Sequence, residues 1–196
     1  MKVSVITPTW NRHDLVCTRA IASVQAQTYR DVEHIVISDG PDPVLRALLA
    51  DYPVTYLECR HHDGHPMNFG SAARNRGLMA ITGDLVAYLD DDNEWRPDHL
   101  ELLVKALDDS GADFAYSAML THPQGTVIGL GPPRYGGIDT SMLMHRASLA
   151  TRWPRPEQIK DDQHAPDWWV VLQWLCAGAT WTSVPKVTVD YRFAGS

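Results

Sequence analysis

Short apolar runs alternate with amphipathic stretches through roughly the first 110 residues. The runs are of the kind that forms strands buried on both faces of a sheet, and they cover residues 2–6, 32–37, 54–57 and 85–89. Apolar residues recur at helical spacing between and after the runs, over residues 16–24, 44–51, 71–81 and 97–107. This β-α alternation predicts an α/β domain with a mostly parallel sheet and right-handed crossovers.

The second half of the chain has a less regular pattern. Residues 114–120 and 126–130 are predicted strands around a turn at 124–125, and residues 181–184 and 187–191 are predicted to close the chain as two strands. A helical stripe precedes them, formed by Trp168, Val171, Leu172 and Leu175 and ended by Gly178. The glycine- and proline-rich residues 129–137 are predicted to form a mobile loop. Without a repeat or a linker, residues 1–196 are expected to form one domain.

Polar residues follow three of the predicted strands directly. Asp90, Asp91 and Asp92 follow the run 85–89, residues 7–9 (Thr-Pro-Thr) follow the first strand, and residues 38–40 (Ser-Asp-Gly) follow the second. Ligands of open α/β sheets bind outside the carboxyl ends of the strands. Crowded carboxylates repel one another unless a cation joins them, and their oxygens suit Mg²⁺, Mn²⁺ or Ca²⁺. One shared site for a divalent metal and a phosphorylated ligand is therefore predicted.

Composition and charge narrow the function classes. The chain of 196 residues has a formal net charge of −7 and no basic block, which argues against electrostatic binding of nucleic acid. The apolar runs are too short to span a membrane, and the predicted strand at the N-terminus leaves no signal peptide. Three cysteines without paired spacing are typical of reduced thiols. A cytoplasmic protein is expected, with peripheral association with a membrane left open.

The turn after the first strand excludes two common phosphate sites. Residues 7–11 contain no glycine, so neither a dinucleotide fingerprint nor a Walker-type loop is present. A diphosphate at this site is therefore expected to be neutralised by a metal rather than cradled by backbone N–H groups.

Four segments in order resemble the family 2 glycosyltransferases of the GT-A fold. They are VSVITPTWNR (residues 3–12), VISDG (36–40), ARNRG (73–77) and YLDDD (88–92). The second half is similar more loosely, through residues 166–169, Gly178 and residues 189–192. The resemblance implies a nucleotide-sugar-binding half over residues 1–110 and a mixed, acceptor-side half over residues 111–196.

The resemblance also implies a reaction and a set of roles. The reaction is inverting transfer of a sugar, of the hexosyltransferase type, from a nucleoside diphosphate sugar, most plainly a UDP-sugar, to a hydroxyl of a glycan, a lipid-linked acceptor or a small molecule. By the family pattern, the nucleotide-sugar site comprises Thr7, Pro8, Thr9, Arg12, Asp39, Arg74, Asp90 and Asp91. Asp39 would bind the base, and Asp92, last of the Asp-x-Asp motif, would bind Mn²⁺ or Mg²⁺. Asp167 would be the catalytic base, as a weak hydroxyl nucleophile requires.

Departures from the family pattern leave alternatives open. Pro166 stands where the family often has Glu, Trp169 stands where it has a second acidic residue, and no histidine follows Tyr191 as a further metal ligand. Asp167 is expected at a helix N-cap, and Asp161 and Asp162 are rival bases. A non-catalytic nucleotide-sugar-binding module and a sugar-nucleotide nucleotidyltransferase remain alternatives, although the latter should carry a glycine-rich basic loop.

Two further groups have ordinary structural interpretations. The polar residues His61, His62, Asp63 and His65 lack the spacing of a helical metal site and are interpreted as loop residues. Most of the tryptophans are expected in the core, with one of Trp168 and Trp169 facing the acceptor.

Overall fold

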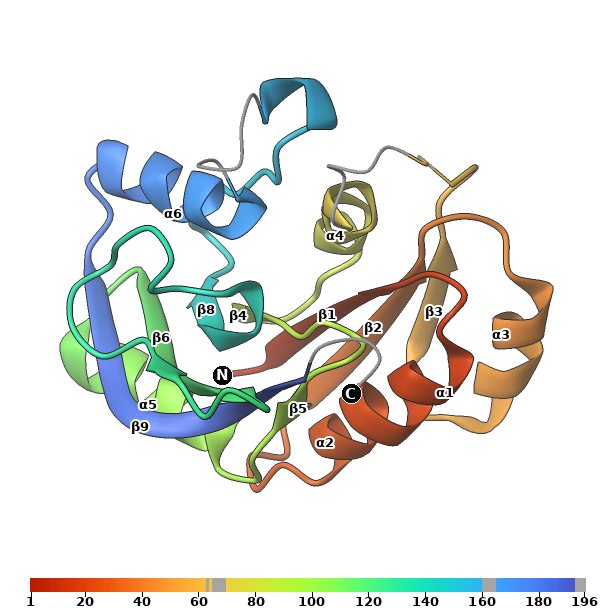
Figure 1. Cartoon of the computed structure of the whole chain (residues 1–196), viewed down its shortest axis with the longest axis horizontal. Helices are drawn as coiled ribbons and strands as arrows, with labels where there is room; N and C mark the ends of the chain where they lie inside the picture. The colour runs from red at the N-terminus through yellow and green to blue at the C-terminus, as the bar shows by residue number, and fades with distance from the viewer. Residues whose placement is uncertain (63, 65–69, 160–164, 193–196) are drawn as a thin grey trace.

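One mixed sheet organises the protein (Figure 1). The computed structural model describes residues 1–62, 64, 70–159 and 165–192. In this part of the chain nine strands join in the order β3-β2-β1-β4-β8-β6-β9-β5, and β7 pairs with β6. The strands are β1 (Val3–Thr9), β2 (Val32–Ser38), β3 (Thr55–Glu58), β4 (Leu85–Tyr88), β5 (Glu94–Trp95), β6 (Phe114–His122), β7 (Val127–Ile128), β8 (Leu143–Arg146) and β9 (Trp181–Arg192).

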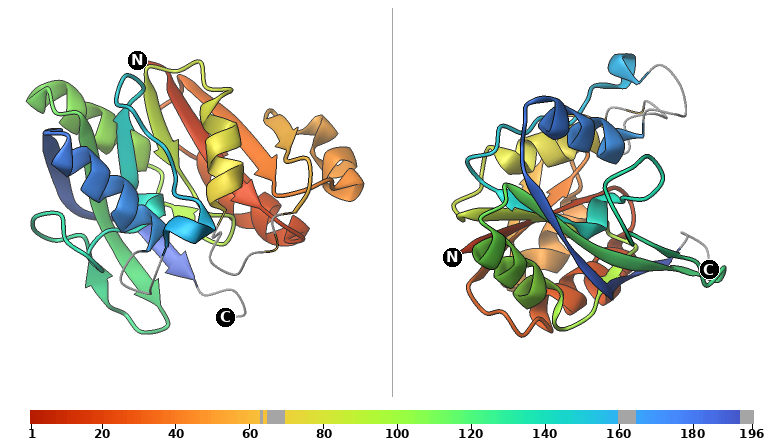
Figure 2. Two further views of the ribbon diagram at one scale, coloured as in Figure 1. Left: turned by 90° about the horizontal axis from the view of Figure 1, so that it is seen from above. Right: turned by 90° about the vertical axis from the view of Figure 1, so that its left-hand side faces the viewer.

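Helices cover both faces of this sheet. They are α1 (His13–Leu15), α2 (Ala22–Gln25), α3 (Pro43–Leu48), α4 (Ser71–Leu78), α5 (His99–Ser110) and α6 (Pro166–Cys176), with a π-helical turn at Val16–Ile21 and 3₁₀ turns η2 (Leu49–Asp51), η3 (Thr140–Met142) and η4 (Pro156–Gln158). Helices α4 and α6 lie on one face, and α1, α2 and α5 lie on the other (Figures 1 and 2). The predicted α/β class with a mostly parallel sheet is confirmed.

The register of the parallel strands brings the predicted polar ends together. All seven residues of β1 are buried, as expected for a central strand. Ile6 of β1 lies opposite Ile35 of β2 on one side and Tyr88 of β4 on the other. The three strands therefore end within a few residues of one another, and the segments after Thr9, Ser38 and Tyr88 share one edge of the sheet.

The later part of the chain differs from the prediction in several places. Strand β9 is one continuous strand of 12 residues rather than two, and irregular pairing opposite residues 117–119 of β6 absorbs its change of register. Strands β5 and β8 were not predicted, because two- and four-residue strands carry too few positions for a period. Helix α4 ends at Leu78, and α6 begins at Pro166, so Asp167 is inside the helix and Ala165 is the N-cap.

Only three of the seven tryptophans are buried, so the expectation that most of them are core residues was wrong. Trp95, Trp153 and Trp174 are buried, whereas Trp168 and Trp169 are half-buried and Trp181 is exposed. The orientation of Trp168 and Trp169 toward an acceptor stays a prediction. None of the helices in the described ranges has the length and apolar character needed to cross a membrane.

Candidate functional site

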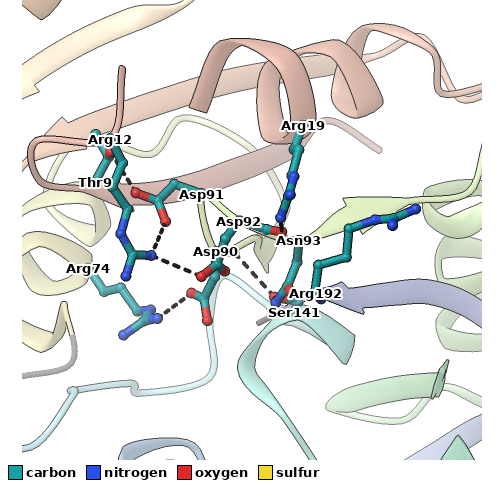
Figure 3. Close-up of polar contacts among 10 residues, drawn as sticks. All are labelled: Thr9, Arg12, Arg19, Arg74, Asp90, Asp91, Asp92, Asn93, Ser141 and Arg192. Atoms are coloured by element: carbon teal, nitrogen blue, oxygen red, sulfur yellow. Dashed lines mark hydrogen bonds and ion pairs between the residues drawn. The ribbon is translucent and has the colours of Figure 1, made fainter. Parts of the chain in front are cut away.

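The acidic run forms a tight turn directly after β4 (Figure 3). The backbone N–H of Asn93 donates to the carbonyl of Asp90 at 3.2 Å and closes the turn. The Ser141 hydroxyl, in η3, accepts the Asp90 N–H at 3.2 Å and the Asn93 side-chain N–H at 3.0 Å. The turn is therefore held by an element that lies about 50 residues further along the chain.

Asp91 points back toward β1 and is almost fully buried (Figure 3). Its Oδ2 accepts from the Thr9 hydroxyl at 2.7 Å, and its Oδ1 accepts from the Arg12 guanidinium at 3.0 Å. Burial raises the pKa of Asp91 to about 6, although both of these donors act to lower it. Both carboxylate oxygens of Asp91 therefore accept hydrogen bonds from side chains of the protein.

Asp90 forms an ion pair with Arg74 of α4 (Figure 3). The Arg74 side chain is only 4% exposed, and its guanidinium carbon lies 4.6 Å from the centre of the Trp153 ring. Contact with an aromatic face stabilises a desolvated guanidinium. Arg74 is therefore a fixed positive charge beside the acidic turn, and its role in donor binding stays a prediction.

Asp92 is the last carboxylate of the turn and lies next to Asp90 (Figure 3). Its carboxylate accepts from Arg12 at 2.9 Å, and its carbonyl accepts from Arg19, in the π-helical turn, at 2.9 Å. Burial and the charge of Asp90 raise the pKa of Asp92 above its usual value. Negative charge at this carboxylate is therefore only partly compensated by Arg12, which favours a further cation.

The donor set fits a divalent metal that is shared with a ligand. The described residues contain no group of three or more His, Cys, Asp or Glu side chains placed to hold a metal ion. Mg²⁺ and similar ions are commonly held by one or two carboxylates together with substrate phosphates and water. The carboxylate of Asp92 fits that mode of binding.

Asp167 approaches the same site from helix α6. Its Oδ1 accepts the N–H of Trp168 at 2.6 Å. Burial and, to a smaller extent, the charge of Asp90 raise the pKa of Asp167 to about 6, although the Trp168 N–H and Arg74 act to lower it. Asp167 and the acidic turn are therefore close enough to interact electrostatically although 75 or more positions separate them in the sequence.

The structure adds Asp139, which sequence reasoning did not single out. Its carboxylate accepts the Ser141 N–H at 2.9 Å at the start of η3. Burial, followed by the charges of Asp90 and Asp167, raises its pKa well above the usual value. Burial and neighbouring carboxylates, Asp139 first among them, also raise the pKa of Tyr191 to about 12. The Asp-x-Ser spacing before η3 was the signal for a capped turn, but not for a place in this site.

The ends of β1 and β2 supply the remaining predicted residues. The N–H of Asp39 donates to the carbonyl of Thr9 at 2.9 Å, so the two strand ends are joined, and Asp39 is 6% exposed. Pro8 is buried beneath Gly70. The Thr7 side chain is buried and lies 2.9 Å from Nε2 of His34, which places its hydroxyl inside the sheet.

Asp161 and Asp162 lie outside the described residues, as do Asp63 and His65. His62 is described and contacts Asp39. The comparison of Asp167 with its rivals therefore stays a matter for experiment.

The structure is similar to solved GT-A glycosyltransferases. The chain is 17% identical to residues 1–349 of TarS from S. aureus, solved in complex with UDP-GlcNAc, with a TM-score of 0.73, covering 100% of this chain and 60% of that one. It is also 17% identical to the mannosyltransferase PcManGT from Pyrobaculum calidifontis, solved with GDP-Man and Mn²⁺, with a TM-score of 0.70, covering 99% of this chain and 57% of that one. The protein has the GT-A fold.

Sequence comparison gives the family. The profile of glycosyl transferase family 2 matches residues 4–156, and the chain belongs to this family. It is 31% identical over 119 residues to the uncharacterized glycosyltransferase YwdF of Bacillus subtilis, covering 60% of this chain and 41% of that protein. It is 36% identical over 105 residues to the succinoglycan biosynthesis protein ExoW of Rhizobium meliloti, covering 50% of this chain and 32% of that protein. The chain thus spans less than half the length of either relative.

Proposed function

We propose that the protein transfers a sugar from a nucleoside diphosphate sugar to an acceptor hydroxyl with inversion at the anomeric carbon. The proposal rests on one observation. Asp167 of α6 is close enough to Asp90 and Arg74 to interact with their charges, and burial raises its pKa to about 6. A carboxyl group with a raised pKa beside the acidic turn fits a glycosyl transfer by general-base catalysis.

The donor would be held by the ends of the parallel strands. Asp39 would accept a hydrogen bond from the base, while Thr9 and Arg12 would line the nucleotide site next to Asp91. Asp92 would hold Mn²⁺ or Mg²⁺ together with the diphosphate. When bound, the cation supplies positive charge that stabilises the leaving diphosphate. A charge-assisted contact of Arg74 with the donor fits its position beside Asp90.

The acceptor would be activated from the other side of the site. Asp167 would take the proton of the attacking hydroxyl, and its place on a separate helix allows attack opposite the leaving diphosphate. The transition state would resemble an oxocarbenium ion, as in glycoside hydrolysis. The half-buried carboxylates Asp90 and Asp139 would lie near that positive charge.

A binding screen tests the donor half of the proposal. UDP, GDP and their sugar conjugates are added to the protein, each with Mn²⁺ and with a chelator, and thermal unfolding is followed. A ligand present at 100 times its dissociation constant should stabilise the protein by about 2.7 kcal/mol. UDP-sugars are the first choice. The absence of any shift with every nucleotide would contradict the proposal.

A further inference from the structure

The ring of His62 contacts Trp10 and Asp39 at the proposed base site. The rings of His62 and Trp10 are stacked, with centroids 4.4 Å apart and planes inclined by 4°. Nδ1 of His62 lies 3.1 Å from Oδ2 of Asp39 and 3.1 Å from the carbonyl oxygen of Asp39. Because both of these atoms are acceptors, Nδ1 of His62 carries a hydrogen.

The backbone is shaped to allow this stack. Gly40 has a φ of +144°, and a Cβ at this position would lie 2.7 Å from the Trp10 ring and 2.9 Å from the backbone nitrogen of His62. A side chain there is excluded both by its backbone conformation and by the space. The glycine after Asp39 therefore lets the indole and the imidazole approach the end of β2.

The contacts of His62 are those that a nucleobase would make. A base needs a flat face to stack on and an acceptor for its ring N–H, and His62 uses Trp10 for the first and Asp39 for the second. Stacked rings at 4.4 Å leave no space for a third ring between them. A base and the His62 ring therefore compete for the same place.

We propose that the His62 imidazole occupies the base site of the free protein and leaves when the nucleotide binds. The inference rests on the proposed function. His62 is then an internal competitor, and the apparent affinity for the nucleotide is lowered by the fraction of molecules in which its ring is in place. The His62 side chain is 39% exposed, so it has room to move away from Trp10.

The same geometry indicates which bases replace the ring. Asp39 accepts from a ring N–H in the structure, and a base in this place must offer one too. Uracil has an N–H at N3 and guanine at N1, whereas cytosine and adenine have a bare nitrogen at the corresponding edge. UDP and GDP should bind, and CDP and ADP should bind more weakly.

Calorimetric titration of the protein with UDP, in the presence of Mn²⁺, tests the competition by whether removal of the His62 ring raises or lowers the affinity for UDP. His62→Ala should bind UDP about three- to tenfold more tightly than the unaltered protein, because one stacking contact and one hydrogen bond no longer compete. His61→Ala, which changes the exposed neighbour, should leave the affinity unchanged. Equal or weaker binding by His62→Ala would overturn the inference, since a residue that holds the base would show weaker binding.

An NMR measurement follows the ring itself. In the free protein the Cε1 proton of His62 should be shifted upfield by the indole, and Trp10→Leu should remove that shift. UDP should also remove it. UDP binding that leaves the His62 signal in place overturns this inference and leaves the proposed function intact. No binding of UDP or GDP, even to His62→Ala, overturns the proposed function and the inference with it.

Discussion

Replacing Asp167 by Asn separates the proposed chemistry from folding. The amide keeps the size of the side chain and an oxygen that can accept the Trp168 N–H, but it cannot take a proton. We expect sugar transfer to fall by roughly 10²-fold or more, which is the usual scale for loss of a general base. Donor binding should stay nearly unchanged, because the donor contacts belong to β1, β2 and the turn after β4.

The same substitution should stabilise the protein. The pKa of Asp167 is about 6 in the folded protein, against an ordinary value of 3.8. The folded state therefore holds the proton more tightly than the unfolded chain, and stability is lost as pH rises from about 4 to 6. About two pKa units correspond to about 3 kcal/mol, an upper bound since the residue is only half-buried. Asp167→Asn should regain about 1–3 kcal/mol at pH 7.5 and nothing at pH 3.5.

Urea unfolding at the two pH values and pH profiles of donor turnover measure both effects. In the unaltered protein, turnover should fall tenfold per pH unit below about 6, because a protonated base is inactive. The residual rate of Asp167→Asn should lack that dependence on Asp167. Asp161→Asn and Asp162→Asn are the matched controls. If either control abolishes transfer while Asp167→Asn transfers at the normal rate, or if the product keeps its configuration, the reasoning is refuted.

Three further predictions concern the rest of the site. Arg74→Met should lower the free energy of unfolding, measured with urea, by roughly 2–3 kcal/mol because it removes the ion pair with Asp90. Its control Arg76→Met, at an exposed position, should change the free energy of unfolding by less than about 0.5 kcal/mol. Asp92→Asn should remove most of the affinity for UDP together with its dependence on Mn²⁺; calorimetry showing equal affinity with and without chelator in the unaltered protein would contradict this. Hydrogen exchange in residues 129–137 should slow when donor is added, as expected for a loop that closes over the site, and unchanged exchange there would count against it.

The parallel part of the fold was predictable because burial on both faces leaves a clear mark on the sequence. Apolar residues predominate in the runs that became β1, β2 and β4, and the helical stripe of α5 (Leu100, Leu103, Val104 and Leu107) is buried. Polar residues directly after such strands identify the edge where a ligand binds. This is why the acidic turn and Asp39 could be placed near each other before the structure was known.

The mixed part was less predictable because its contacts are distant in sequence. Asp139 enters the site through η3, and Ser141 fixes the acidic turn by bonds that no local pattern encodes. The predicted N-cap of α6 was wrong by two residues. Asp167 was expected there, but Pro166 occupies the first position of the helix and Ala165 is the N-cap. The stack of His62 on Trp10 likewise depends on tertiary structure. Gly40 makes room for the stack, but a single glycine in the sequence does not predict it.

Release of nucleoside diphosphate from a sugar nucleotide tests the central claim most directly, because water can act as a slow acceptor when the natural one is unknown. The protein is incubated with UDP- and GDP-sugars and Mn²⁺, and free UDP or GDP is measured. We expect release with at least one donor, loss of release in Asp92→Asn, and a reduction of about 10²-fold or more in Asp167→Asn with donor binding retained. Release that neither substitution reduces, or donor binding without any turnover above a protein-free blank, would contradict the proposed glycosyl transfer.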